Sequence, residues 1–192
     1  MADEPLTAEQ ILEVAEDVLR RYGASKATVV DVARVLGISH GSVYRHFPSK
    51  SALRDAVTER WLARISDPLA AIAAQDTPAD DRLREWVDYL VHAKRRLASE
   101  DPELFNSYME LAAEAREVIA DHVQTLVTQL TAIVAAGVDQ GIFRVRDTSL
   151  AARAVFDATT RFHNPAHAYQ WDDPEIDQAY ESVWLLITKG LA

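Results

Sequence analysis

The stretch from Thr28 to Lys50 reads TVVDVARVLGISHGSVYRHFPSK, and it contains two short helical patterns separated by Gly37. In the first pattern, Thr28 is followed three residues later by Asp31, which resembles a capping box with a shorter acid. A glycine can adopt the left-handed backbone conformation that ends a helix. The first pattern therefore predicts a helix that ends before Gly37.

The second pattern predicts a helix from Ser39 to about Phe47. Ser39 is a favourable N-cap, and Pro48 disfavours helical geometry in the residue before it. Only Val43 and Phe47 are expected to point inward, because the other positions are small or able to form hydrogen bonds. Two short helices joined by a glycine turn predict a helix-turn-helix, whose second helix is narrow enough to enter the major groove of DNA.

Helical periodicity continues on both sides of this motif. Before it, a threonine cap at Thr7 and an apolar stripe at helical spacing predict a helix that ends at Gly23. After it, Ser49 caps a longer helix, and further apolar stripes are separated by breaks at residues 76–78 and 101–102. No alternating strand pattern of useful length occurs, so the sequence predicts an all-α fold of about nine helices.

The composition excludes several classes of protein. The chain has 192 residues, no cysteine and a formal net charge of −10. Without cysteine there is no disulfide framework, thiolate zinc site or cysteine nucleophile. The acidic start lacks the apolar stretch of a signal peptide, and the longest uncharged apolar run, Leu130 to Val138, has about half the length that a bilayer requires. We therefore expect a soluble, cytoplasmic protein that does not span a membrane.

The basic residues are concentrated in and around the helix-turn-helix. Residues 20–54 hold seven Lys or Arg and one acid, whereas residues 55–192 hold 13 bases and 23 acids. A basic block in an acidic chain indicates that this block faces a polyanion such as DNA. Charge alone leaves open an alternative, a helical protein-interaction adaptor whose basic block binds an acidic partner.

Residues 28–57 resemble the DNA-binding motif of the TetR-type transcriptional regulators, and the run VYRHFPSK followed by an apolar helix is specific to that family. The resemblance implies that residues 1–50 form a three-helix DNA-binding domain. It implies that residues 51–192 form a six-helix domain for effector binding and dimerisation. The expected function is a sequence-specific repressor, not an enzyme, that a small-molecule effector releases from an inverted-repeat operator.

The resemblance assigns DNA contacts residue by residue. Four residues that open the second helix would face base edges: Ser39, His40, Gly41 and Ser42. Five residues around them would contact the phosphate backbone: Thr28, Tyr44, Arg45, His46 and Lys50. Arg45 could equally contact a base edge. Tyr44 could instead be a core aromatic, and Lys50 could be a solvated charge at a helix start.

The C-terminal part carries weaker predictions. A pocket for the effector is expected near four residues that combine ring surface with polar handles near helix breaks: Phe105, Tyr108, Phe162 and His163. The eighth predicted helix runs from about Leu150 to Phe162. Its small residues and one face of the last helix suit a four-helix interface between two subunits, with these residues in contact: Ala151, Ala154, Ala158, Val183, Trp184 and Ile187.

Other titratable clusters give alternatives. His163 and His167 have a spacing that places two metal ligands on one helical face, which would suit a small all-α metalloenzyme. Asn164 and Pro165 break that helix, so no metal and no other cofactor is expected. The basic run at residues 94–96 is interpreted as a solvated helix end.

Overall fold

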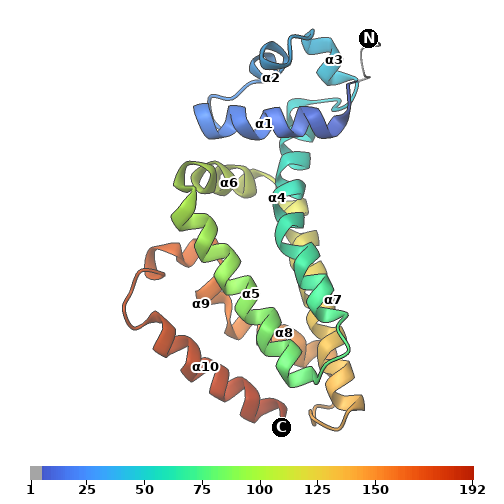
Figure 1. The fold of residues 1–192 in the computed structure, drawn as a ribbon, viewed down its shortest axis with the longest axis vertical. Coiled ribbons are helices and arrows are strands. Elements are labelled where there is room, and N and C mark those ends of the chain that lie inside the picture. The colour runs from blue at the N-terminus through green and yellow to red at the C-terminus, as the bar shows by residue number, and fades with distance from the viewer. Residues whose placement is uncertain (1–5) are drawn as a thin grey trace. The chain divides into compact units, whose positions relative to one another are not determined.

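The computed structural model describes residues 6–192, which divide into two compact units. Unit 1 comprises the described residues up to Leu62 together with Asp101–Ala120, and unit 2 comprises Ala63–Glu100 together with Asp121–Ala192. Over the described residues the structure contains ten α-helices, one 3-10 helix and no strand (Figure 1). The predicted all-α class, with an N-terminal helix-turn-helix domain followed by a C-terminal helical domain, is confirmed.

Unit 1 contains the helix-turn-helix and the helices that support it. Its helices are α1 (Ala8–Tyr22), α2 (Val29–Leu36), α3 (His40–Tyr44), the first part of α4 (Lys50–Ala73) and α6 (Pro102–Glu114). The fold prediction placed the end of the third helix at about Phe47, whereas α3 ends at Tyr44 and the chain reaches α4 through a turn.

The boundaries of α1 follow from local chemistry. Thr7 Oγ1 accepts a hydrogen bond from the Gln10 amide at 3.2 Å, and Gln10 Oε1 accepts one from the Thr7 amide at 2.9 Å. The helix ends at Gly23, whose φ of 76° is favourable for glycine. Ile11 and Val18 lie on its buried face. The predicted cap and the predicted end of this helix are therefore confirmed.

Polar side chains connect the supporting helices of unit 1. The Arg54 guanidinium on α4 donates to the carbonyl oxygen of Ala24 and forms an ion pair with Glu114 at the end of α6. The Ser107 hydroxyl on α6 donates to the carbonyl oxygen of Leu19 at 3.2 Å. These contacts connect α4 with α6 and with the segment that leads into α2, and they connect α6 with α1.

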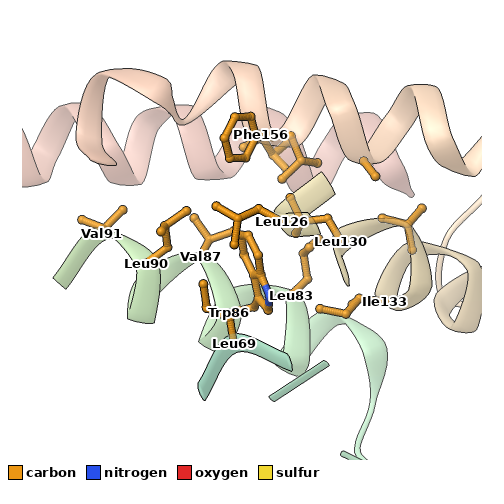
Figure 2. Packing of buried hydrophobic residues seen from close by; sticks show 14 of the residues in the cluster. Leu69, Leu83, Trp86, Val87, Leu90, Val91, Leu126, Leu130, Ile133 and Phe156 are labelled. Atoms are coloured by element: carbon orange, nitrogen blue, oxygen red, sulfur yellow. The ribbon is translucent and has the colours of Figure 1, made fainter. Parts of the chain in front are cut away.

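Unit 2 is a helical bundle. It contains the rest of α4, then α5 (Ala79–Glu100), most of α7 (Arg116–Asp139), α8 (Thr148–Ala158), α9 (Thr160–His163), the 3-10 helix η1 (Pro165–Gln170) and α10 (Ile176–Leu191). In Figure 2, Val87 of α5, Leu126 of α7 and Phe156 of α8 point into one shared interior. Trp86 is 1% exposed, and its indole N–H donates to Gln129 Oε1 at 3.0 Å.

The segment predicted as one helix from about Leu150 to Phe162 is two helices, and this prediction was wrong. The break lies at Thr159, whose buried hydroxyl donates to the carbonyl oxygens of Val155 and Phe156 at 2.9 and 3.1 Å. Such back-bonding competes with the helical backbone ladder and bends helices. The break and the 3-10 helix that follows raise the number of elements above the expected nine.

By length and composition alone, α7 could cross a bilayer, and it is the one helix of residues 6–192 that meets this test. The core helix of a globular protein meets the same test. Leu126, Leu130 and Ile133 of α7 are buried in the core of unit 2.

Candidate functional site

Two local structures fix the first helix and the turn of the helix-turn-helix. The Thr28 side chain accepts from the Asp31 amide at 3.2 Å, and the Asp31 carboxylate accepts from the Thr28 amide at 3.1 Å. The hydrogen bond from the Thr28 hydroxyl also lowers the pKa of Asp31. Gly37 adopts φ 67° and ψ 27°, the left-handed conformation that turns the chain toward α3. Both the capping box and the glycine turn agree with the sequence prediction.

A short hydrogen-bonded chain lies along the start of α3. Ser39 Oγ accepts from the Ser42 amide at 3.2 Å, and the two serine hydroxyls lie 2.9 Å apart. An Arg45 guanidinium nitrogen donates to Ser42 Oγ at 3.2 Å. The predicted N-cap at Ser39 is confirmed. The serines thus present hydroxyl groups at the outer face of the helix and hold the Arg45 side chain along it.

Val43 is the one fully buried residue of α3, with no exposed surface, and Phe47 is 8% exposed. Both therefore belong to the core, as expected. Tyr44 is 41% exposed, and its ring meets the His40 ring edge-on with centroids 6.3 Å apart. A core role for Tyr44 does not fit this exposure.

The nine residues that the sequence assigned to DNA are all at least partly exposed, and we call them the recognition face: Thr28, Ser39, His40, Gly41, Ser42, Tyr44, Arg45, His46 and Lys50. They come from the start of α2, from α3 and the turn after it, and from the start of α4. All of them lie in unit 1. Hydroxyl, imidazole and cationic groups form hydrogen bonds or ion pairs with base edges and phosphates.

Lys50 is the first residue of α4 and is exposed. The Ser49 hydroxyl caps this helix by accepting from the Ala52 amide at 3.0 Å. The first turn of α4 holds no acid, and within the described chain Lys50 forms no ion pair. A helix N-terminus has a positive partial charge, so a lysine there is unfavourable for the helix and favourable for a bound phosphate.

The four residues predicted for the effector are buried, two in each unit. In unit 1, Tyr108 packs edge-on against Trp61 with ring centroids 6.0 Å apart, and burial raises the pKa of Tyr108 to about 12. Phe105, in the same helix, is 8% exposed. In unit 2, Phe162 packs against Tyr180 at 5.1 Å.

His163 is 4% exposed and packs against the ring of Phe156 at 4.9 Å. Burial, together with the positive charge of Lys94, lowers the pKa of His163 to about 4. His167 lies in η1, beyond Asn164, whose side chain accepts from the Ala166 amide at 3.0 Å and so begins the new helix. Within residues 6–192, no three His, Asp or Glu side chains come together as a metal site would require.

The sequence analysis missed two residues of this region. Lys94 is 4% exposed, so the interpretation of this residue as part of a solvated helix end was wrong. Burial lowers the pKa of Lys94 to about 8. Burial and the charges of Lys94 and His163 lower the pKa of His122 to about 3. Their positions gave the missing signal, because each continues an apolar stripe: Lys94 lies seven residues after Val87, and His122 lies four before Leu126.

The residues predicted for a subunit interface lie on α8 and α10. Between these helices is an apolar groove of about 450 Å³, lined by Val145, Ala151, Ala154, Val155, Ala158, Val183, Leu186, Ile187, Gly190 and Leu191. Ile187 is 9% exposed, whereas Leu186, which the sequence analysis did not select, is 70% exposed. Trp184 lies beside the groove, with the Arg84 guanidinium 5.0 Å from its ring centroid.

Comparison with known proteins gives two family matches. Residues 11–57 match the family described as bacterial regulatory proteins, tetR family, and residues 79–184 match the family described as tetracyclin repressor-like, C-terminal domain. An HTH-type transcriptional repressor of Mycobacterium tuberculosis is 30% identical over 120 residues, which are 60% of this chain and 63% of the repressor. The chain thus spans less than two thirds of the length of that relative.

Solved structures show the same fold over nearly the whole chain. A TetR transcription regulator from Haloarcula marismortui has a TM-score of 0.69 at 22% identity, covering 96% of this chain and 97% of its own. The regulator FadR from Bacillus subtilis, solved in complex with stearoyl-CoA, has a TM-score of 0.67 at 16% identity, covering 97% and 100%.

Proposed function

The chain belongs to the tetR family of bacterial regulatory proteins and is a transcriptional regulator, and from this we propose that it is a cytoplasmic repressor which a small-molecule effector releases from an inverted-repeat operator. The recognition face is the observation that supports the DNA-binding part of this proposal. Its helix, α3, contributes only Val43 to the core and leaves hydroxyl and imidazole groups outside. The alternative of a metalloenzyme has no metal cluster in the described residues to support it.

Within the recognition face the roles divide by chemistry. Ser39, His40, Gly41 and Ser42 read base edges in the major groove, and Arg45 reaches a base or a phosphate. Thr28, Tyr44, His46 and Lys50 contact phosphates and set the register. Substitution of His40 is therefore expected to change which sequence is preferred, whereas loss of a phosphate contact weakens binding to all sequences alike.

One recognition helix contacts too few base pairs to find a site in a genome, so we propose a twofold dimer with its two recognition helices about 34–36 Å apart, or a multiple of that distance. The apolar groove between α8 and α10 supports this proposal, because five of the six residues predicted for the interface line it. Its occupant is the same face of a second copy, which makes a four-helix interface.

The effector acts by shifting a two-state equilibrium. It binds more tightly to a conformation whose recognition helices no longer match successive major grooves, and it thereby lowers the affinity for the operator. By thermodynamic linkage, the operator lowers the affinity for the effector by the same factor. Bound fragments selected from the genome of origin would identify the operator and the genes beside it.

The test is a binding titration with the selected operator and a scrambled duplex at several salt concentrations. The operator is expected to bind about 10³-fold or more tightly than the scrambled duplex at physiological salt. Variant His40→Ala is expected to lose most of this preference, while the control Arg96→Ala, an exposed cation in unit 2, retains it. Equal binding to both duplexes across the salt series would remove the proposal.

A further inference from the structure

A pocket of about 450 Å³ lies in unit 2 between the last turns of α5 and η1, and the DNA-binding role does not use it. In Figure 1, α5 runs alongside α9, and η1 follows α9 in the chain. We call it the arginine pocket, and its walls include Arg95, Arg96, Ala98, Ala168, Trp171 and Asp172. None of the four residues that the sequence analysis predicted for the effector lines this pocket.

We propose that the effector is an organic monocarboxylate, and that it binds in the arginine pocket with its carboxylate on Arg95. This inference rests on the proposed function, because it names the chemical class of the effector. Three features of the pocket support it: the incomplete hydrogen bonding of Arg95, the balance of charge in the walls, and the apolar part of the walls.

The protein satisfies the Arg95 guanidinium only in part. The side chain is 17% exposed, and its Nη1 donates to Asp177 Oδ1 at 2.7 Å. Its Nε and Nη2 are buried and have no hydrogen-bond partner within the described residues, although most buried polar atoms in proteins have one. A guanidinium presents its N–H groups as a planar fork that matches the two oxygens of a carboxylate. A bound carboxylate would therefore supply the partners that Arg95 lacks.

The contact between Arg95 and Asp177 does not prevent this. The Asp177 side chain is 82% exposed, so water screens the ion pair, and such exposed pairs contribute little to stability. A rotation of the Arg95 side chain that turns Nε and Nη2 toward the pocket thus loses little. Asp177 holds the guanidinium while the pocket is empty and competes with the carboxylate of a ligand.

The charges in the walls favour an anion with a single negative charge. Two arginines and one acid, Asp172, line the pocket, which leaves one positive charge when His92, also in the wall, is neutral. Two further acids reach these arginines and are mostly exposed: Asp177 on Arg95, and Glu100 at 4.0 Å from Arg96. A metal cation would be repelled by the arginines, and a phosphate dianion would bring a second negative charge to a wall that already contains Asp172.

The rest of the wall can hold the body of an organic acid. Ala98, Ala168 and Trp171 offer apolar surface. The indole N–H of Trp171 donates to the carbonyl oxygen of Arg161 at 3.0 Å, which holds the ring in place. The volume falls within the range of pockets that bind small organic molecules, and such pockets combine apolar walls with a few polar groups.

The test is calorimetric titration of the full-length protein with benzoate, phenylacetate and hexanoate, each compared with its primary amide. At least one acid is expected to bind about tenfold or more tightly than its amide, which is the usual effect of a hydrogen bond to a charged group. Phenyl phosphate tests the charge of the ligand and is expected to bind more weakly than the best of the acids.

Substitutions at Arg95 test the contact with the carboxylate. Variant Arg95→Met is expected to lose about tenfold or more in affinity for the acid. Variant Arg95→Lys keeps the charge but not the planar fork, so it is expected to recover only part of this loss. The matched control is Arg146→Met, because Arg146 is an exposed arginine of unit 2 outside the pocket, and it retains wild-type affinity.

Two further variants leave Arg95 in place. Variant Ala98→Leu extends a side chain of the wall into the pocket and is expected to lower affinity for the acid about tenfold or more, while leucine remains a good helix former in α5. Variant Asp177→Asn removes the competing carboxylate and is expected to raise affinity about threefold. A merely structural role of Arg95 would not produce this gain.

Equal binding of acid and amide, tighter binding of phenyl phosphate than of every acid, unchanged affinity in Arg95→Met or Ala98→Leu, or failure of all three acids to bind would overturn this inference. The acid that binds is also expected to lower operator affinity about fivefold or more in the wild type and not in Arg95→Met. An acid that binds without changing operator affinity would not be the effector. Operator binding without acid is measured on the same protein, so a failure of the proposed function is seen separately.

Discussion

At the scale of single residues, Gly41 is expected to be needed for DNA binding and not for the stability of the fold. A Cβ atom added at Gly41 would meet only Ser39 Oγ, at an ordinary distance of 3.7 Å. Variant Gly41→Ala is therefore expected to be as stable as the wild type or more stable by about 0.5–1 kcal/mol, since alanine is the better helix former. Its operator affinity is expected to fall by about tenfold or more, because the methyl group would crowd a base edge.

The measurements are a urea unfolding curve and an operator titration on the same preparation of Gly41→Ala. The control is Arg96→Ala, because Arg96 is an exposed residue of unit 2 that lies outside the apolar groove. Operator affinity equal to that of the wild type would show that α3 does not approach the bases at this point.

Lys50 offers a second residue-scale prediction. Removal of this exposed cation from the positive end of α4 is expected to stabilise the fold slightly, by about 0.3–1 kcal/mol. Operator affinity falls, and the plot of log affinity against log salt becomes shallower by about one per subunit, because one phosphate contact per subunit is lost. Variant Lys50→Ala is compared with Arg96→Ala, and an unchanged salt slope would mean that Lys50 is only a solvated charge.

At this scale the sequence predicted the structure well, and the reason is that caps are local. Thr7, Thr28 and Ser39 accept hydrogen bonds from amides three residues ahead, so their role depends only on neighbouring residues. Gly23 and Gly37 end their helices with a positive φ, and the ability to adopt it depends only on the glycine itself. The recognition face follows from the same stretch of sequence.

At the scale of whole elements, tertiary packing overrode the sequence pattern. Lys94 was interpreted from its charge, although its position on the stripe of α5 predicted burial, and the structure buries it. The break at Thr159 arises from a buried hydroxyl that bonds backward, which no periodicity reports. The division of the predicted effector residues between two units could not be predicted from apolar stripes, because a stripe does not say which helices meet.

Two buried histidines of unit 2, His122 in α7 and His163 in α9, predict sensitivity to acid. Burial lowers the pKa of His122 to about 3 and that of His163 to about 4, so both histidines are neutral in the fold. The unfolded chain takes up protons below about pH 6.5 while the folded chain does not, and stability therefore falls as the pH falls. Between pH 6.5 and pH 5 the expected loss is on the order of 1 kcal/mol for each histidine.

Urea unfolding at pH 7 and pH 5 measures this loss. The double variant His122→Gln/His163→Gln is expected to lose less stability than the wild type over this interval, because it lacks the two groups that titrate. Variant His92→Gln serves as the control, since His92 is exposed. The same loss in the double variant and the wild type would mean that other groups are responsible.

At the scale of the whole molecule, the proposed subunit interface shows that an apolar stripe does not identify the exposed face of a helix. Ile187 was selected from the stripe of the last helix, yet it is 9% exposed and belongs to the core of its own unit. Its neighbour Leu186 is 70% exposed and lines the groove. An apolar stripe marks the most apolar face of a helix. In a subunit that has its own core, this face packs into that core.

Leu186 is therefore the residue that tests the dimer. A glutamate there would place a charge in an apolar groove, and its twofold mate would bring a second charge of the same sign to the same interface. Variant Leu186→Glu is expected to be a folded monomer by sedimentation at concentrations where the wild type is a dimer. Tyr169→Glu is the control, because Tyr169 is 80% exposed and lies outside the groove.

The same variant connects the assembly with DNA recognition. In a dimer, binding of one half-site raises the effective concentration of the second recognition helix at the other half-site. Loss of the dimer is expected to lower affinity for the full inverted repeat by about 10²-fold or more and to leave affinity for an isolated half-site unchanged. A monomeric Leu186→Glu that bound the full repeat as tightly as the wild type would show that operator recognition does not depend on this interface, and a dimeric one would place the interface elsewhere.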